Sequence, residues 1–224
     1  MDSLFVNENT STSKTMRLHR IPDETIRRLP TYLQGLLLLS RQGHTRINSR
    51  QLAERLRINP PQIRKDLSYF GDFGTPGVGY DIDELSRRLR EILSLDRPHR
   101  VALVGYGNLG AALLKYPGFG AFGFEIVAVF DRDRRKIGRT VRGLTIRDNR
   151  EIPMLRQDDV RLAILAIPAD GAQDTAEMLV AAGVQGILNF APEYSVYLPN
   201  TVKVITMDIG MDLARLPYYV PVEV

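Results

Sequence analysis

Residues 100–116 read RVALVGYGNLGAALLKY, an apolar strand that runs into three spaced glycines and then into an apolar helix. This order gives the GxGxxG spacing the context of a phosphate-binding turn. Gly105 would permit the tight turn, Gly107 the approach of a pyrophosphate to the backbone, and Gly110 close packing of the helix on the sheet. Phosphate would then lie at the helix N-terminus, where free amides and the helix dipole favour an anion. The stretch predicts the first βα unit of a Rossmann-like domain.

Asp131 ends the next apolar strand, EIVAVFD, 21 residues beyond Gly110. A carboxylate at this position accepts hydrogen bonds from both ribose hydroxyls and repels a 2′-phosphate, which favours NAD over NADP. Arg132, Arg134 and Arg135 leave NADP open, because an arginine can hold that phosphate. A Rossmann-like domain whose glycines serve only the turn is the alternative. We predict an NADH/NAD⁺ site that includes Gly105, Tyr106, Gly107, Asn108, Leu109, Gly110, Asp131 and Arg132.

The chain after Arg100 alternates apolar strands with helical segments. Strands are expected at 100–105, 124–130, 160–167 and 186–189. Strands that alternate with helices are typical of a parallel sheet.

The region before Arg100 has a helical pattern. A first helix is expected from Pro22-Asp23 to just before Gly43, kinked or split at Pro30. A second begins at Asn48 or Ser49, and a third opens with Pro60-Pro61 and runs to about Phe70. This spacing predicts a helix-turn-helix unit. The outward face of its third helix would carry Gln62, Arg64, Lys65, Ser68 and Tyr69.

The segment GDFGTPGVGY, residues 71–80, has four glycines around two aromatic residues, which suits a β-hairpin or wing. A fourth helix follows from Asp81 to about Leu95. The expected class is α/β, an N-terminal winged helix-turn-helix domain followed by a Rossmann-like parallel-sheet domain. We predict a disordered arm over 1–15, the winged-helix domain over 16–96, the NAD(H)-binding domain over 97–216 and a tail over 217–224.

The net charge of +4 is unevenly distributed. Residues 14–70 hold 12 basic and 4 acidic side chains, which suits a phosphate backbone as partner. The alternative is a solvated basic face.

Several classes are disfavoured. The 224 residues include no Cys, so neither disulfides nor thiolate metal sites are expected. No signal peptide or membrane-spanning stretch is recognisable, which favours the cytoplasm and no membrane partner. An NAD enzyme is not expected: only about 125 residues follow Arg100, the three histidines precede the pocket, and no Tyr-x-x-x-Lys pair exists. Lys115, Lys136 and Lys203 look like isolated surface residues.

Seven motifs together resemble the Rex family of bacterial redox-sensing transcriptional repressors. They are RLPTYL (28–33), IRKDLSYFG (63–71), GTPGVGY (74–80), VGYGNLG (104–110), KYPGF (115–119), FDRD (130–133) and GILNFAP (186–192). The resemblance covers residues 21–216. It implies a homodimer that binds a palindromic, A/T-rich operator and releases it when NADH occupies the Rossmann domains.

The same resemblance implies roles for particular residues. Arg64 and Lys65 would contact phosphate or guanine, and Ser68 and Tyr69 the backbone or base edges, although Tyr69 could instead pack beneath the wing. The nicotinamide slot would be built from the strand ends at Ile167, Pro168, Asn189, Phe190, Ala191 and Pro192, with Phe190 equally explained as core.

Three departures from the family pattern stand out. Pro76 occupies the wing position where a basic residue usually reaches the minor groove, so operator flanks would be read more weakly. A network that couples the domains would join Tyr116 and Asp208 to a first-helix Arg, but Gln34 stands there, so we expect weaker coupling. Pro217 follows Leu216, which makes a swapped C-terminal helix less certain.

Two rival functions remain from the sequence: a small NAD-binding oxidoreductase, and a DNA-binding protein whose Rossmann domain only dimerises or binds another nucleotide. The operator sequence, the regulated genes and the relative affinities for NADH and NAD⁺ are not encoded in any recognisable motif.

Overall fold

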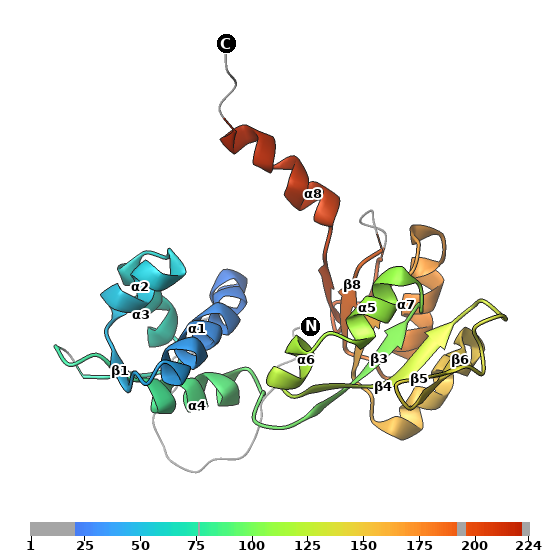
Figure 1. The fold of residues 1–224 in the computed structure, drawn as a ribbon, viewed down its shortest axis with the longest axis horizontal. Coiled ribbons are helices and arrows are strands. Elements are labelled where there is room, and N and C mark those ends of the chain that lie inside the picture. The colour runs from blue at the N-terminus through green and yellow to red at the C-terminus, as the bar shows by residue number, and fades with distance from the viewer. Residues whose placement is uncertain (1–20, 76, 192–195, 221–224) are drawn as a thin grey trace. The chain divides into compact units, whose positions relative to one another are not determined.

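The computed structural model describes residues 21–75, 77–191 and 196–220. The chain divides into two compact units, residues 1–94 and 95–224, and each has its own core (Figure 1). The arm expected over 1–15, Pro76, Pro192 and the end of the tail lie outside the described residues.

The described residues of the first unit, 21–75 and 77–94, contain four helices and a two-stranded antiparallel sheet. These are α1 (Asp23–Arg41), β1 (Arg46–Ile47), α2 (Ser49–Leu56), α3 (Pro60–Ser68), β2 (Tyr80–Asp81) and α4 (Ile82–Ile92). Helix α1 is continuous from Asp23 to Arg41, so of the two expectations for Pro30, a kink or a split, the split is wrong. Pro30 is exposed, where water can satisfy the carbonyl that its missing N–H leaves free. The apolar stripe on the opposite side of α1 is buried at Leu29, Tyr32, Leu33, Leu36 and Leu39.

Local signals set the ends of α2 and α3. Asn48 caps α2 by accepting a hydrogen bond from the Gln51 backbone N–H at 2.9 Å, and the Gln51 side chain accepts one from the Asn48 N–H at 3.0 Å. Arg57 ends α2 in the left-handed conformation, and Pro60 starts α3 where no intrahelical N–H is needed. The turn between the helices is therefore short and well determined.

A wing connects α3 to α4. Thr75 pairs with Gly79, and β2 then pairs with β1, which is the pairing expected of a hairpin or wing. Gly79 has a φ of 93°, and a Cβ there would lie 2.5 Å from the Ile47 carbonyl oxygen. Only glycine allows the wing to approach β1 this closely.

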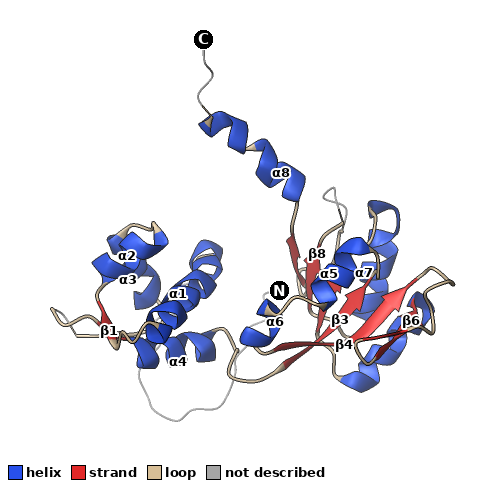
Figure 2. Ribbon diagram, in the orientation of Figure 1, coloured by secondary structure: helices blue, strands red, loops and turns tan. Residues whose placement is uncertain are grey.

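The second unit is a seven-stranded sheet in the order β5-β6-β4-β3-β7-β8-β9, parallel except for β5 (Figure 2). Its strands are β3 (His99–Val104), β4 (Phe124–Asp131), β5 (Thr140–Val141), β6 (Leu144–Asp148), β7 (Leu162–Leu165), β8 (Gly186–Asn189) and β9 (Lys203–Thr206). Its helices are α5 (Asn108–Leu114), α6 (Gly118–Ala121), α7 (Ala172–Ala181) and α8 (Ile209–Ala214), with 3₁₀ segments η1 (Asn149–Asp158), η2 (Ala169–Gly171) and η3 (Leu216–Tyr219).

Both faces of the sheet are covered. Ala102 and Val104 of β3 pack in one core cluster with residues of α7 and η1. Val101 and Leu103, which alternate with them, pack in a second cluster against α5 and α6. Strands buried on both faces explain the continuous apolar run VALV in β3.

The chain reverses direction across the sheet at β3. From β3 it passes outward to β4 and β6, and β7, β8 and β9 then fill the other side. In open α/β sheets a ligand crevice forms at such a switch point, outside the carboxyl ends of the strands. The fold therefore places a crevice at the end of β3, where the glycines lie.

The second unit ends in a short helical segment with exposed apolar side chains. Helix α8 has six residues and is followed by η3 around Pro217. Its exposed large hydrophobic side chains are Ile209, Met211, Leu213, Leu216, Tyr218 and Tyr219. A helical stretch that exposes this much apolar surface is typical of an interface.

Candidate functional site

A pocket of about 370 Å³ lies at the carboxyl ends of β3, β4, β6 and β7. Its lining combines backbone, charged and apolar groups: Gly105, Gly107, Asp131, Arg132, Asp133, Lys136, Asn149, Ala166, Ile167, Pro168, Gly171 and Thr175. This is the crevice that the strand order predicts.

The three glycines of the motif differ in what they do. A Cβ on Gly105, whose φ is 97°, would lie 2.3 Å from the Ala166 carbonyl oxygen, and one on Gly110 would lie 1.8 Å from the Gly105 oxygen. The fold therefore requires glycine at both positions, 105 and 110. A Cβ on Gly107 would meet nothing within 4 Å, and its φ of −88° suits any residue. No packing requirement within the chain accounts for glycine at position 107, and the space beside it is open to the pocket.

Asp131 is buried, with 6% of its surface exposed. It accepts hydrogen bonds from the backbone N–H groups of Tyr106 and Asp133, both at 2.8 Å, and from Lys136 Nζ at 3.0 Å. Burial alone would raise the pKa of Asp131, but these donors outweigh it and lower the pKa. The carboxylate is therefore ionised at neutral pH, as a ribose-binding acid needs to be.

The expectation that Lys136 is an isolated surface residue is wrong. The Lys136 side chain is only 30% exposed and pairs with Asp131. The turn after β4 brings it there, since the Lys136 N–H donates to the Asp133 carbonyl oxygen at 2.9 Å. Lys136 and Asp131 are five residues apart in the sequence, and this spacing is not part of any recognisable motif.

Other residues of the predicted cofactor site lie at the pocket rim or on the first turn of α5. Arg132 lines the pocket and pairs with Asp170 of η2 at 3.3 Å. The remaining predicted residues of the motif, Asn108 and Leu109, are exposed on α5.

The predicted nicotinamide slot is only partly assembled. Ile167 and Pro168 line the pocket, whereas Asn189, Phe190 and Ala191 do not. Asn189 is fully buried, and its oxygen accepts from the Ala191 N–H at 2.9 Å. Ala191 is core, and Phe190 packs against the second core cluster, which favours its interpretation as a core residue.

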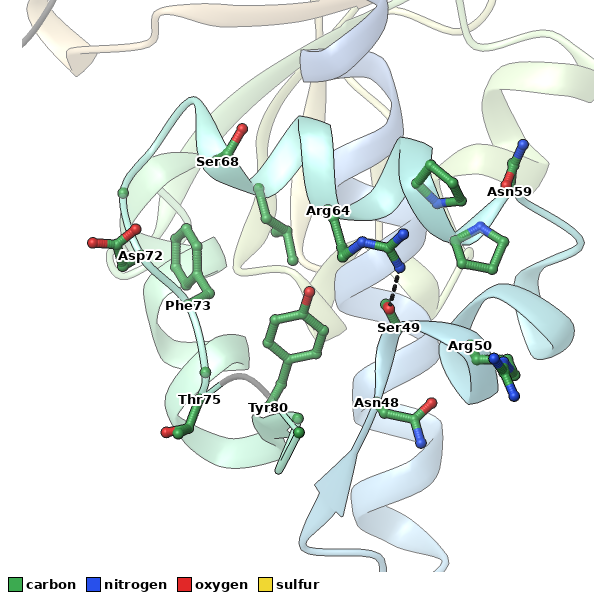
Figure 3. Close-up of a pocket in the computed structure, with 17 residues that line it drawn as sticks. Asn48, Ser49, Arg50, Asn59, Arg64, Ser68, Asp72, Phe73, Thr75 and Tyr80 are labelled. Carbon is green, nitrogen blue, oxygen red and sulfur yellow. Dashed lines mark hydrogen bonds between the residues drawn. The ribbon is translucent and has the colours of Figure 1, made fainter.

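A larger groove, about 1060 Å³, occupies the first unit between α3, the start of α2 and the wing (Figure 3). Arg64 extends across it and donates from Nη1 to the Ser49 hydroxyl at 2.8 Å. Ser68 and Thr75 lie along the same groove, and Lys65 is exposed on α3. Tyr69 ends α3 and is half-buried. Arg64, Lys65 and Ser68 thus form an accessible basic and polar face, as expected of a recognition helix.

Gln62 does not lie freely on that face. Its amide donates to Asp66 Oδ1 at 2.8 Å, and the residue is partly buried. Asp66 is fully buried and also accepts from Thr25 Oγ1 at 3.0 Å and from Tyr32 OH at 2.5 Å. Arg28 completes the cluster with two hydrogen bonds, at 2.6 and 2.9 Å.

This Asp66 cluster ties the recognition helix α3 to α1. Burial alone would raise the pKa of Asp66, but the hydrogen bonds of its four partners outweigh it and lower the pKa to about 2. Sequence reasoning missed the cluster, although Arg28, Tyr32 and Asp66 all fall within motifs that it quoted.

The three residues of the expected coupling network are placed as follows. Gln34 is exposed on α1, within the first unit. In the second unit Tyr116 is 57% exposed and lies edge-on to Phe119, and Asp208 caps α8 by accepting from the Met211 N–H at 3.0 Å.

Comparison with known proteins gives full-length relatives. The chain is 41% identical to the redox-sensing transcriptional repressor Rex of Desulforamulus reducens, over 91% of this chain and 97% of the relative. It is 45% identical to Rex of Thermus thermophilus, over 89% and 93%. The chain belongs to the Rex family.

The other comparisons agree with this membership. Residues 20–68 match a family model described as "Putative DNA-binding protein N-terminus", and residues 96–193 match one described as "CoA binding domain". The solved structure of RSP in complex with β-NAD⁺ and operator DNA superposes with a TM-score of 0.84 at 35% identity, covering 90% of this chain and 93% of that one. RSP in complex with β-NADH gives a TM-score of 0.81 at 33% identity, covering 90% and 94%.

Membership confirms the expected fold class and the choice of a transcriptional regulator over an enzyme. No helix in the described parts of the chain is long and apolar enough to cross a membrane.

Proposed function

We propose that the chain is a DNA-binding repressor that senses the NADH/NAD⁺ ratio. It would bind a palindromic, A/T-rich operator through the groove around Arg64 and release it when NADH enters the pocket beside Gly107. The domains would be those expected from the sequence, 16–96 for DNA and 97–216 for cofactor. Relatives that align over more than nine-tenths of their length are named redox-sensing repressors, and RSP has been solved with β-NAD⁺ and operator DNA and with β-NADH.

One observation carries the cofactor half of this proposal: Gly107 borders open space in a pocket that also contains an ionised Asp131. A pyrophosphate beside Gly107 leaves the adenosine ribose within reach of Asp131. The residues present therefore fit a dinucleotide. The name of the matched CoA family indicates a second ligand to test, since CoA and NAD share an ADP moiety.

NADH must bind the DNA-releasing state more tightly than the DNA-binding state, because a ligand with equal affinity for both shifts nothing. The reduced nicotinamide ring is neutral, so it loses less hydration than the cationic ring of NAD⁺ when it enters an apolar slot. Ile167 and Pro168 at the end of β7 provide apolar groups on that side of the pocket. Release by NADH and tolerance of NAD⁺ would follow from this difference.

The repressor would act as a homodimer in the cytoplasm. A single recognition helix rarely gives enough affinity, and a palindromic operator mirrors a two-fold axis. The exposed apolar side chains of α8 and η3 support an interface at that end of the second unit.

The test is fluorescence anisotropy on a palindromic A/T-rich duplex at a stated salt concentration, titrated with NADH, NAD⁺ and CoA in parallel. We expect binding to the duplex and release by NADH alone. Gly107→Val is the matched control, because it closes the open space without meeting the protein, so it should bind DNA and ignore NADH. Indifference of the unmodified protein to NADH would refute sensing, and turnover of NADH with a 2-oxo acid would favour the enzyme alternative.

A further inference from the structure

An unpaired polar group lies in the wall of the pocket. The Oδ1 atom of Asn149 is buried, and within the described residues it has no hydrogen-bond partner. Asn149 is also one of the residues that line the pocket. Buried acceptors in folded proteins are almost always paired, so this one needs an explanation.

The position of Asn149 beside the sheet indicates which part of a bound dinucleotide its side chain would contact. Asp131 at the end of β4 is paired in register with Asp148 at the end of β6, and Asn149 is the next residue. The sheet order β6-β4-β3-β7 then places the pocket groups in a row. Asn149 comes first, followed by Asp131, the glycines after β3, and Ile167 and Pro168 after β7.

A dinucleotide that follows this row has its pyrophosphate at the glycines and its adenosine ribose at Asp131. The base attached to that ribose then lies on the β6 side, away from Ile167 and the nicotinamide. Asn149 is the lining residue at the end of β6. This step rests on the cofactor site of the proposed function.

We propose that Asn149 selects a 6-aminopurine at the cofactor's base. The exocyclic amine of adenine is a hydrogen-bond donor. The Asn149 oxygen is a hydrogen-bond acceptor that has no donor among the described residues. An asparagine amide can bond the amine and the adjacent ring nitrogen of adenine together. Rotation of the amide about χ2, a broad torsion, turns the oxygen toward the pocket.

The same chemistry disfavours a 6-oxopurine. On the N7 side of the base, adenine offers an amine donor and a nitrogen acceptor, whereas hypoxanthine offers two acceptors, so the Asn149 oxygen would find no donor there. Reduced nicotinamide hypoxanthine dinucleotide differs from NADH only at this edge of the base, where the carbonyl replaces the amine and N1 carries a hydrogen. The ratio of the two affinities therefore reports on the base contact alone.

The test measures the Kd of both dinucleotides by isothermal titration on the full-length protein, together with the concentration of each that releases operator DNA. We expect the unmodified protein to bind NADH about tenfold more tightly than the hypoxanthine analogue. Asn149→Leu, similar in size but without polar atoms, should lower that ratio to about one. Asn149→Asp, which keeps an acceptor, should preserve the ratio or increase it.

The outcomes separate this proposal from the proposed function. If NADH binds and releases DNA but Asn149→Leu keeps the same ratio, the base contact is wrong while the sensing function stands. If the unmodified protein does not bind NADH, sensing itself is wrong. Operator affinity without cofactor should be the same for all three proteins, which shows that each is folded.

Discussion

Replacing Asp66 with Asn should weaken the first unit strongly. Asp66 Oδ1 accepts from Thr25, Gln62 and one Arg28 nitrogen, and Oδ2 accepts from Tyr32 and the other. An amide NH₂ in place of either oxygen would face at least two donors. The substitution thus removes the negative charge, and it also places the NH₂ group of the new amide against groups that are themselves hydrogen-bond donors.

The size of the effect follows from burial. Removing one partner of a buried ion pair costs about 3–5 kcal/mol. The Arg28 side chain is 28% exposed and can partly regain water, so we expect the lower end, about 3 kcal/mol. For a domain of this size that corresponds to a fall in Tm of roughly 12–24 °C.

The assay is thermal unfolding of the full chain followed by circular dichroism, with hydrogen exchange of α1 and α3 peptides to assign the transition to the first unit. Asp72→Asn is the control, because Asp72 is an exposed carboxylate of the same unit and should change stability by less than about 0.5 kcal/mol. Combining Asp66→Asn with Arg28→Met should recover part of the loss, since no unpaired charge remains. If Asp66→Asn melted like Asp72→Asn, the Asp66 cluster would not be a stabilising element.

Four further outcomes are expected. Because the pKa of Asp66 is lowered from 3.8 to about 2, its contribution should be complete above about pH 5 and be lost as the pH falls to about 1, so urea denaturation should show the gap between the unmodified protein and Asp66→Asn shrinking by roughly 2.5 kcal/mol over that range. Gly110→Ala should lower Tm because its Cβ meets the Gly105 oxygen, whereas Gly107→Val should keep Tm and lose NADH binding by titration calorimetry; equal melting of the two would contradict the division of roles. Pro76→Arg should raise operator affinity and sharpen A/T preference at the flanks in anisotropy competition, and unchanged flank preference would count against it. Gln34→Arg should strengthen NADH-driven release, and an unchanged NADH midpoint would exclude a role for that position in coupling.

The helices of the first unit and the central strands could be predicted because each has a local signal. Asn48 before a helical pattern and Pro60 at a helix start are recognisable without tertiary information. The run VALV before Gly105 identifies a strand buried on both faces. Strands β5, β6 and β9 were not predicted. They have two, five and four residues, so none has a hydrophobic period long enough to detect.

The missed site residues depend on contacts between distant segments. Asp66 follows the exposed Lys65 on the recognition helix, and its partner Thr25 is 41 positions away. Asn149 lines the pocket because β6 lies beside β4 in the sheet, and this strand order cannot be predicted from a local residue pattern. The family resemblance implies Asn189 in the nicotinamide slot, and in the structure its side-chain oxygen accepts a hydrogen bond from the Ala191 backbone N–H.

The Asp66 cluster also changes how the basic charge of the first unit should be counted. Arg28 contributes to the excess of cations in the sequence, but its charge is already neutralised inside the fold. Only cations that contact DNA phosphates release counterions, about 0.9 for each phosphate neutralised. The salt dependence of operator binding should therefore reflect groups such as Lys65 and omit Arg28. Asp66 leaves the count together with Arg28, so the net charge of the first unit is unchanged, while one cation fewer is available to DNA phosphates.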